Sequence, residues 1–135
     1  MPSIEQIPAY LVWPIRHQAM YPELNLEDVK IENDDDATHL GLFDHNKLIS
    51  VVSLFQIGQE IRFRKFATLT EYQNMGYGSL LLEYMIGFSK EQNCKRIWCN
   101  ARKAACDFYK KYHFQENSQI IEKADLIYVI MELNL

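Results

Sequence analysis

The segment from Thr70 to Ser79 joins a polar turn to two closely spaced glycines. The turn Thr70-Glu71-Tyr72 is followed by Gln73-Asn74-Met75-Gly76-Tyr77-Gly78-Ser79, where an extended segment gives way to a helical repeat. The first N–H groups of a helix have no intrahelical partner and lie at the positive end of its dipole, so they attract anions. Glycine lets a phosphate approach the backbone closely. The segment can therefore hold a pyrophosphate, although glycines at this spacing equally fit tight packing of a helix against a sheet.

The elements on either side of this segment must position it. Apolar residues recur with a helical period from Gly76 to about Gln92, at Tyr77, Leu81, Tyr84, Met85 and Phe88. Residues 60 to 69 predict a strand whose apolar side changes from odd to even positions between Phe63 and Phe66, which fits a β-bulge. The segment from Thr70 to Ser79, the candidate anion site, is thus predicted to be a strand-to-helix turn.

The remaining chain predicts further strands and helices. Residues 8 to 15 predict a first strand that turns into a short helix ending before Pro22, and residues 39 to 55 predict a hairpin with a tight turn at 44 to 47. After the long helix we expect a strand over 95–100, a helix over about 104–112 with Ala105, Phe108, Tyr109 and Tyr112 on its inner face, and strands over 114–122 and 126–133 joined through 123–125. The acidic residues between 23 and 37 predict a solvated loop or frayed helix rather than a metal site.

This order, strand, helix, three strands, helix, strand, helix and two strands, indicates a mixed α/β fold in which helices flank one sheet. The length of 135 residues suits one ordinary hydrophobic core. Neither repeats nor linkers interrupt the pattern, so we expect residues 1–135 to form a single domain.

Composition excludes several classes of function. A formal net charge of -4 argues against non-specific binding of nucleic acid. The start of the chain does not read as a signal peptide, and no run approaches the roughly 20 apolar residues that span a bilayer, so no membrane association is expected. Three cysteines, Cys94, Cys99 and Cys106, form neither an even disulfide framework nor a CxxC pair, which favours the reducing cytoplasm. No spaced ligand set predicts a metal.

The sequence TLTEYQNMGYGSLLLEYM at 68 to 85 resembles the acetyl-CoA-binding motif of the GNAT N-acetyltransferase superfamily, Q/R-x-x-G-x-G/A. Gln73, Gly76 and Gly78 fill its positions in order. The resemblance extends to ARKAACDFYKKYHF at 101 to 114, which is similar to the family's second motif; the matching residues are Ala105, Phe108, Tyr109, Lys111 and Phe114. Two residues depart from that motif. Arg102 stands where many members have an asparagine that contacts pantetheine, and His113 replaces the usual glycine.

The resemblance covers nearly the whole chain and implies a fold and a reaction. The implied fold is a mostly antiparallel central sheet of 6–7 strands, flanked by helices and splayed between the fourth and fifth strands. The implied reaction is direct transfer of an acetyl group from the cosubstrate acetyl-CoA to an amine of a small molecule or peptide, without a metal. Dimers are common in the superfamily, so a homodimer is one expected state.

The resemblance also implies roles for individual residues. Tyr109 is the implied general acid, which protonates the departing thiolate, and its phenol has a reference pKa of about 10. Backbone groups of Phe66, Ala67 and Thr68 are implied to pair with the pantetheine arm and to polarise the thioester carbonyl. The implied cofactor-binding residues of the turn and of the second motif are Gln73, Asn74, Met75, Gly76, Tyr77, Gly78, Ser79 and Arg102. Without the resemblance, Tyr109 reads as a core aromatic residue.

The general base and the acceptor are not fixed by the sequence. Glu60 and Glu71 are only guesses for the base, and His17, His39 and His45 receive no role. Nucleophilic catalysis by Cys99 or Cys106 is disfavoured, because buried cysteines usually pack as small hydrophobic residues. The acidic run from Glu23 to Asp36 is the basis for a hypothesis that the acceptor is a cationic amine.

Two other classes of function stay open. A non-catalytic module that binds CoA or acyl-CoA is suggested by the departures at Arg102 and His113. A dinucleotide-binding oxidoreductase fits less well, because two glycines stand where three are expected, and Lys95 and Arg96 occur where an acidic ribose partner is expected.

Overall fold

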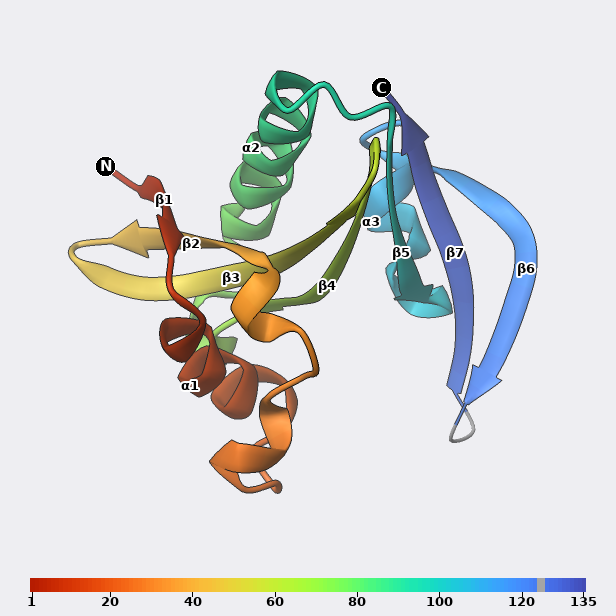
Figure 1. The fold of residues 1–135 in the computed structure, drawn as a ribbon. Helices are drawn as coiled ribbons and strands as arrows, with labels where there is room; N and C mark the ends of the chain where they lie inside the picture. Colours follow the sequence, from red (N-terminus) through yellow and green to blue (C-terminus); the bar gives the residue numbers. More distant parts are fainter. Residues whose placement is uncertain (124–125) are drawn as a thin grey trace. The chain divides into compact units, whose positions relative to one another are not determined.

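Figure 1 shows the helices and strands of the computed structural model. The chain divides into two compact units. Unit 1 consists of residues 1–55 and 63–88, and unit 2 of residues 56–62 and 89–135. The structure describes residues 1–123 and 126–135, including their side chains except those of 118–121 and 123. The end of the predicted connection over 123–125 therefore lies outside the described residues.

The described residues form seven strands in the hydrogen-bonded order β1-β2-β3-β4-β5-β7-β6. The strands are β1 Ser3–Ile7, β2 Thr38–Asp44, β3 Lys47–Ile57, β4 Glu60–Thr68, β5 Arg96–Arg102, β6 Gln115–Lys123 and β7 Leu126–Asn134. The pairs β1–β2, β2–β3, β5–β7 and β6–β7 are antiparallel, and β4 runs parallel to β5. This is the mixed, mostly antiparallel sheet that was predicted. The β4–β5 register spans Glu60–Arg62 and Arg96–Trp98, a short pairing of the kind implied for splayed strands.

Helix α1, Ala9–Met20, occupies most of the segment that we predicted as a first strand. The first strand is instead β1, Ser3–Ile7, so the prediction for residues 8 to 15 was wrong. An apolar run of this length does not by itself distinguish a strand from a buried helix segment. The helix buries Val12, Ile15 and Arg16, and it accommodates Pro14 on its exposed side, where the missing N–H costs one backbone hydrogen bond.

The acidic stretch between α1 and β2 contains two short 3₁₀ helices, η1 Leu26–Val29 and η2 Asp34–Asp36. The prediction of a solvated segment holds for Asp35 and Asp36, which are exposed, but was wrong for Asp34, whose exposed fraction is 4%. A sequence pattern within the segment cannot reveal this burial, because the partners of Asp34 lie on other elements.

The predicted hairpin is formed by β2 and β3. Asp44 pairs with Lys47, and the two residues between them, His45 and Asn46, have φ angles of 52° and 64°. Positive φ at both central residues is the signature of a type I′ turn, which matches the twist of the two strands. The local turn chemistry therefore located this hairpin correctly.

Strand β4 contains an irregularity near the point where the apolar pattern changes. Lys65 has a φ of 56°, in the left-handed region that residues with a Cβ rarely adopt. Ile61, Phe63 and Ala67 are buried, whereas Phe66 is half-buried. The rings of Phe63 and Phe66 nevertheless contact each other, with their centroids 6.5 Å apart, so the irregular backbone at Lys65 agrees with the predicted change in the apolar pattern.

Helix α2, Tyr77–Glu91, confirms the long helix of the sequence pattern. Leu81, Leu82 and Met85 are fully buried and form its inner face. Tyr84 was predicted on that face but is 43% exposed. The pattern assigned Tyr84 to the wrong side because Leu82, not Tyr84, completes the buried stripe.

Unit 2 places β5 beside β7 and contains a short helix. Ile97, Cys99 and Ala101 alternate as buried residues along β5. The predicted helix over about 104–112 is a 3₁₀ turn, η4 Lys103–Ala105, followed by helix α3, Cys106–Lys110. With α3 included, the order of strands and α-helices is the predicted one.

Three further findings bear on function. No helix within the described part of the chain is long and apolar enough to cross a membrane. Among the same residues, no group of three or more His, Cys, Asp or Glu side chains is arranged to hold a metal ion. Cys94, Cys99 and Cys106 are buried free thiols.

Candidate active site

The turn before α2 has a backbone suited to an anion. It begins with the 3₁₀ helix η3, Thr70–Tyr72, and passes through Asn74 and Gly76 with φ angles of 62° and 89°. The N–H of Leu80 donates to the carbonyl of Gly76 at 3.2 Å, so the N–H groups of Tyr77–Ser79 precede this first bond of the helix. Donors at such a position point away from the helix and attract negative charge. Gly76 is needed here because its left-handed φ strains any other residue.

Two side chains fix this turn to the rest of unit 1. The amide Nε2 of Gln73 donates to the carbonyl of Thr68 at 3.0 Å, which ties the turn to the end of β4. The hydroxyl of Tyr77 donates to Asp44 Oδ2 at 2.5 Å, which ties the start of α2 to the end of β2. This hydrogen bond lowers the pKa of Asp44 and raises the pKa of Tyr77. Asn74 and Met75 are exposed, so the turn presents its tip to solvent.

The strand segment Phe66–Thr68 precedes the turn within unit 1. The Ser50 hydroxyl donates to the carbonyl of Ala67 at 3.1 Å and lies 2.8 Å from the Thr68 hydroxyl. Ala67 is buried, and Phe66 and Thr68 are half-buried. The Gln73–Thr68 hydrogen bond connects this strand segment to the turn. All of the predicted cofactor-binding residues except Arg102 therefore lie in unit 1.

Tyr109 lies on α3 in unit 2, with 8% of its surface exposed. Its ring packs between Phe108 and Phe114, with centroid distances of 5.2 and 5.5 Å. A side-chain hydrogen bond links it to Cys99 on β5. Burial, with the neighbouring Cys99, raises the pKa of Tyr109 well above 10. The phenol therefore remains protonated throughout the neutral range and keeps a proton to donate.

The two residues that depart from the second motif also lie in unit 2. His113 adopts a φ of 72°, which is the left-handed conformation that the usual glycine adopts without strain. Arg102 is the exposed last residue of β5, and its carbonyl accepts a weak hydrogen bond from Cys106 Sγ at 3.7 Å. The backbone at His113 thus keeps the conformation expected for the glycine of the motif. At Arg102, by contrast, a long cationic side chain stands where the motif has an amide.

The side chains considered as general bases are engaged elsewhere. Glu60 pairs with Arg96 at 2.9 Å, and exposed Glu71 lies 3.8 Å from Lys47. His17 lies 2.6 Å from the carbonyl of Leu24. His45 is exposed beside Asp44. None of these contacts singles out one group as the base.

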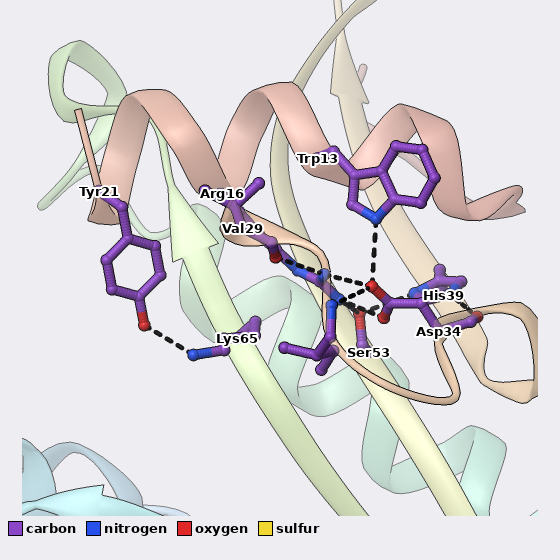
Figure 2. Close-up of polar contacts among 9 residues, drawn as sticks. Trp13, Arg16, Tyr21, Val29, Asp34, His39, Ser53 and Lys65 are labelled. Atoms are coloured by element: carbon purple, nitrogen blue, oxygen red, sulfur yellow. Dashed lines mark hydrogen bonds and ion pairs between the residues drawn. The ribbon is translucent and has the colours of Figure 1, made fainter. Parts of the chain in front are cut away.

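A buried charged network in unit 1 was not predicted from the sequence (Figure 2). The guanidinium of Arg16, which is fully buried, donates to both carboxylate oxygens of Asp34 at 2.7 and 2.9 Å and to Ser53 Oγ at 2.8 Å. Trp13 Nε1 and the N–H of Ile31 also donate to Asp34. The network joins α1, η2 and β3, and the only sequence signal for it is a charged residue within the apolar face of α1.

His39 completes the network. Its Nε2 lies 2.8 Å from the carbonyl of Asp34, and its Nδ1 lies 2.7 Å from Ser53 Oγ. Because a carbonyl only accepts, Nε2 carries a proton, and Ser53 Oγ, which accepts from Arg16, also pairs with Nδ1. His39 therefore has a hydrogen-bond partner at each ring nitrogen, which fits a structural role in the network.

The cysteines do not form a nucleophilic site. Burial raises the pKa of all three thiols, and for Cys99 the value is about 12. A neutral buried thiol is a poor nucleophile. The interpretation of Cys99 and Cys106 as packing residues therefore agrees with their environment.

Comparison with known families decides the class of protein. A family model described as "Acetyltransferase (GNAT) family" matches residues 5–114. The chain belongs to this family. It is therefore a GNAT N-acetyltransferase, and its mixed α/β sheet has the fold of that family.

Curated relatives of this GNAT N-acetyltransferase have related names. The uncharacterized N-acetyltransferase YitI of Bacillus subtilis is 29% identical over 125 residues, which cover 86% of this chain and 84% of YitI. The uncharacterized N-acetyltransferase YlbP of the same organism is 27% identical over 124 residues, which cover 84% of this chain and 73% of YlbP.

Solved structures share the fold at low sequence identity. The ribosomal-protein-S18-alanine N-acetyltransferase from Escherichia coli has a TM-score of 0.82 at 19% identity and covers 99% of this chain and 94% of its own. A GNAT family acetyltransferase from Elizabethkingia anophelis, solved with acetyl-CoA bound, has a TM-score of 0.79 at 16% identity and covers 99% and 98%. At these identities the likeness establishes the fold alone.

Proposed function

We propose that residues 1–135 act as one acetyltransferase domain that transfers an acetyl group from acetyl-CoA directly to an amine of a small molecule or peptide. The observation that carries the proposal is the turn Gln73–Ser79, with its left-handed Asn74 and Gly76 and its N–H groups ahead of the first hydrogen bond of α2. Such a backbone suits the diphosphate of CoA. The acetyl-CoA bound in the fold neighbour from Elizabethkingia anophelis supports the same cosubstrate.

In this proposal, the cofactor-binding residues divide by the part of CoA that they hold. The N–H groups of residues 75–79 bind the diphosphate, while Gln73 and Asn74 shape the turn. Backbone groups of Phe66–Thr68 pair with the pantetheine arm, and an N–H of this strand polarises the thioester carbonyl; such a contact is worth roughly 100- to 1,000-fold in rate. Arg102 replaces the amide of the family motif near the pantetheine.

Proton transfer completes the proposed reaction. The neutral amine attacks the thioester carbon, the C–N bond forms, the C–S bond breaks, and the amine proton leaves to solvent. Tyr109 gives its phenolic proton to the CoA thiolate and regains one from solvent. The raised pKa keeps Tyr109 protonated at neutral pH, so its hydroxyl can donate a hydrogen bond to the thiolate as the charge develops.

The test is release of free CoA thiol from acetyl-CoA in the presence of a broad panel of primary amines. We expect amine-dependent release. Binding of acetyl-CoA without release for any amine contradicts transfer and supports the second candidate, a non-catalytic CoA-binding module, which the replacement of the motif asparagine by Arg102 favours.

The buried free thiols Cys94, Cys99 and Cys106 favour a cytoplasmic location within this proposal. A homodimer stays a prediction, which analytical ultracentrifugation tests directly.

A further inference from the structure

Two consecutive cations of β4, Arg64 and Lys65, have side chains on one face of unit 1. Lys65 Nζ donates to the hydroxyl of Tyr21, the residue after α1, at 2.7 Å (Figure 2). Arg64 lies over the ring of Phe55 on β3, 5.9 Å from its centroid. Phe55 is two residues from Ser53, which contacts Arg16 of α1, and residues two apart on a strand point to the same face. Both cations therefore lie on the α1 side of unit 1.

Neighbouring residues of a regular strand point to opposite faces. Lys65 escapes this alternation because its φ of 56° interrupts the strand. Such irregularities redirect side chains and are frequent beside active sites. The strained backbone at Lys65 thus concentrates two positive charges on one face, immediately before Phe66–Thr68.

Aromatic rings, rather than carboxylates, hold both cations. Lys65 Nζ lies 4.8 Å from the centroid of Tyr21, besides its hydrogen bond to the hydroxyl. Within the described residues, neither Arg64 nor Lys65 forms an ion pair. By contrast, Arg96, which also stacks on an aromatic ring, pairs with Glu60 and Glu132. Stacking orients a cation while its remaining donors can bind an anion.

In the acidic segment before β2, several carboxylates already have partners within the protein. Asp34 is buried against Arg16, and Glu27 pairs with Lys30 at 2.9 Å. Asp28 accepts from the N–H of Asn25 at 3.3 Å. These carboxylates stabilise the segment, which weakens the case for a cationic acceptor based on composition alone.

We propose that Arg64 and Lys65 form an anion-binding pair for the acyl acceptor, so that the substrate is an amine that also carries a carboxylate or phosphate group. The inference rests on the proposed function, because Phe66–Thr68 are there assigned to the thioester arm. The acceptor's anionic group binds the pair, and its amine is directed toward the adjacent strand segment. Tyr21 is the positioning residue that orients Lys65.

The experiment compares acceptors with and without an anionic group, at equal concentrations of the neutral amine. Amino acids are tested against their carboxamides, and O-phosphorylated amino alcohols against the parent amino alcohols, by release of CoA thiol. We expect kcat/KM to be about 10- to 100-fold higher for one charged class, as one or two charge-assisted hydrogen bonds provide. The class of acceptor with the higher kcat/KM shows whether the anionic group of the substrate is a carboxylate or a phosphate.

Variants locate the effect at the pair. Lys65→Gly removes the cation and also relieves the left-handed strain. Urea denaturation of this variant separates a loss of stability from a loss of the charge. Both Lys65→Gly and Arg64→Gln are expected to abolish the preference for charged acceptors and to leave acetyl-CoA affinity and turnover of neutral acceptors unchanged. Lys65→Arg keeps the charge and is expected to retain the preference. Lys90→Met, at an exposed cation of α2, is the matched control and should change nothing.

Equal turnover of charged and neutral acceptors by the wild type overturns the inference, and so does an equal loss on both classes in Lys65→Gly. Failure of the proposed function is distinguishable, because then no amine releases CoA or acetyl-CoA does not bind in calorimetry.

Discussion

Tyr109 combines a polar group with an apolar setting. Its hydroxyl is linked to Cys99, while Phe108 and Phe114 surround its ring. Desolvation makes the phenolate costly, so the hydroxyl stays protonated and can yield its proton only to a strong nearby base. A departing thiolate is a weaker base than this phenolate, because a free thiol has a pKa of about 8.5. The Tyr109 hydroxyl therefore stabilises the thiolate first by donating a hydrogen bond to it, and the final proton comes from solvent through Tyr109.

Replacement Tyr109→Phe keeps the ring and removes the hydroxyl. We expect kcat to fall by roughly 100- to 10,000-fold, the usual contribution of a positioned acid, while the dissociation constant for acetyl-CoA stays near the wild-type value. Steady-state thiol release and calorimetry measure the two quantities. Tyr112→Phe, on the next turn, serves as the control, and an unchanged kcat in Tyr109→Phe removes this residue from the mechanism.

Asp34 links stability to pH. Burial raises its pKa, but hydrogen bonds from Arg16, Ile31 and Trp13 outweigh this effect and lower the pKa from 3.8 to about 2. Since the pKa is lower in the folded state, the ionised carboxylate stabilises the fold above pH 3.8, and this contribution of about 2 kcal/mol is lost as the pH falls through about 2.

Replacement Asp34→Asn should lower the free energy of unfolding at pH 7 by roughly 3–5 kcal/mol, because it leaves the buried Arg16 without its counter-charge. It should also flatten the loss of stability below pH 3.8. Urea denaturation at several pH values measures both effects. Asp35→Asn, an exposed neighbour in η2, should stay within about 0.5 kcal/mol of the wild type; equal behaviour of the two variants contradicts the structural role of the network.

At the scale of elements, we expect opposite effects from substituting two glycines, one directly before α2 and one within it. Gly76 has a φ of 89°, so Gly76→Ala is expected to lower the free energy of unfolding by roughly 1–2 kcal/mol. Gly87 lies within the helix, and no atom outside its own helical backbone and chain neighbours lies within 4 Å of the position that a Cβ would occupy there. Gly87→Ala is therefore expected to raise the free energy of unfolding by roughly 0.5–1 kcal/mol. Urea denaturation compares them, and stabilisation by both substitutions contradicts the left-handed turn.

Elements with local signals were predicted well from the sequence. The hairpin turn at His45 and Asn46 and the start of α2 depend on residues close in the chain, and both were predicted at the right positions. The first part of α1 was predicted as a strand, because its buried face, which includes Arg16, depends on Asp34 and Ser53, which are distant in sequence. Tyr84 was misassigned for a related reason, since the buried stripe of α2 is set by packing.

At the scale of the whole chain, the order of the strands and α-helices and the family could be predicted, whereas the distribution of charge could not. Composition suggested an acidic segment facing an acceptor. The structure instead neutralises Asp34 internally and leaves Arg64 and Lys65 stacked on aromatic rings. Both outcomes depend on contacts between elements, which composition does not contain.

The central claim is that main-chain amides at the start of α2 bind the diphosphate of a CoA thioester. Isothermal titration calorimetry of the folded chain with acetyl-CoA tests it most directly. We predict one site with a dissociation constant on the order of 1–100 μM, within the usual range for enzyme substrates, and binding at least about tenfold weaker in Gly76→Ala but unchanged in Gly87→Ala. Folded wild-type protein that gives no heat of binding, or equal affinity in Gly76→Ala, contradicts the claim.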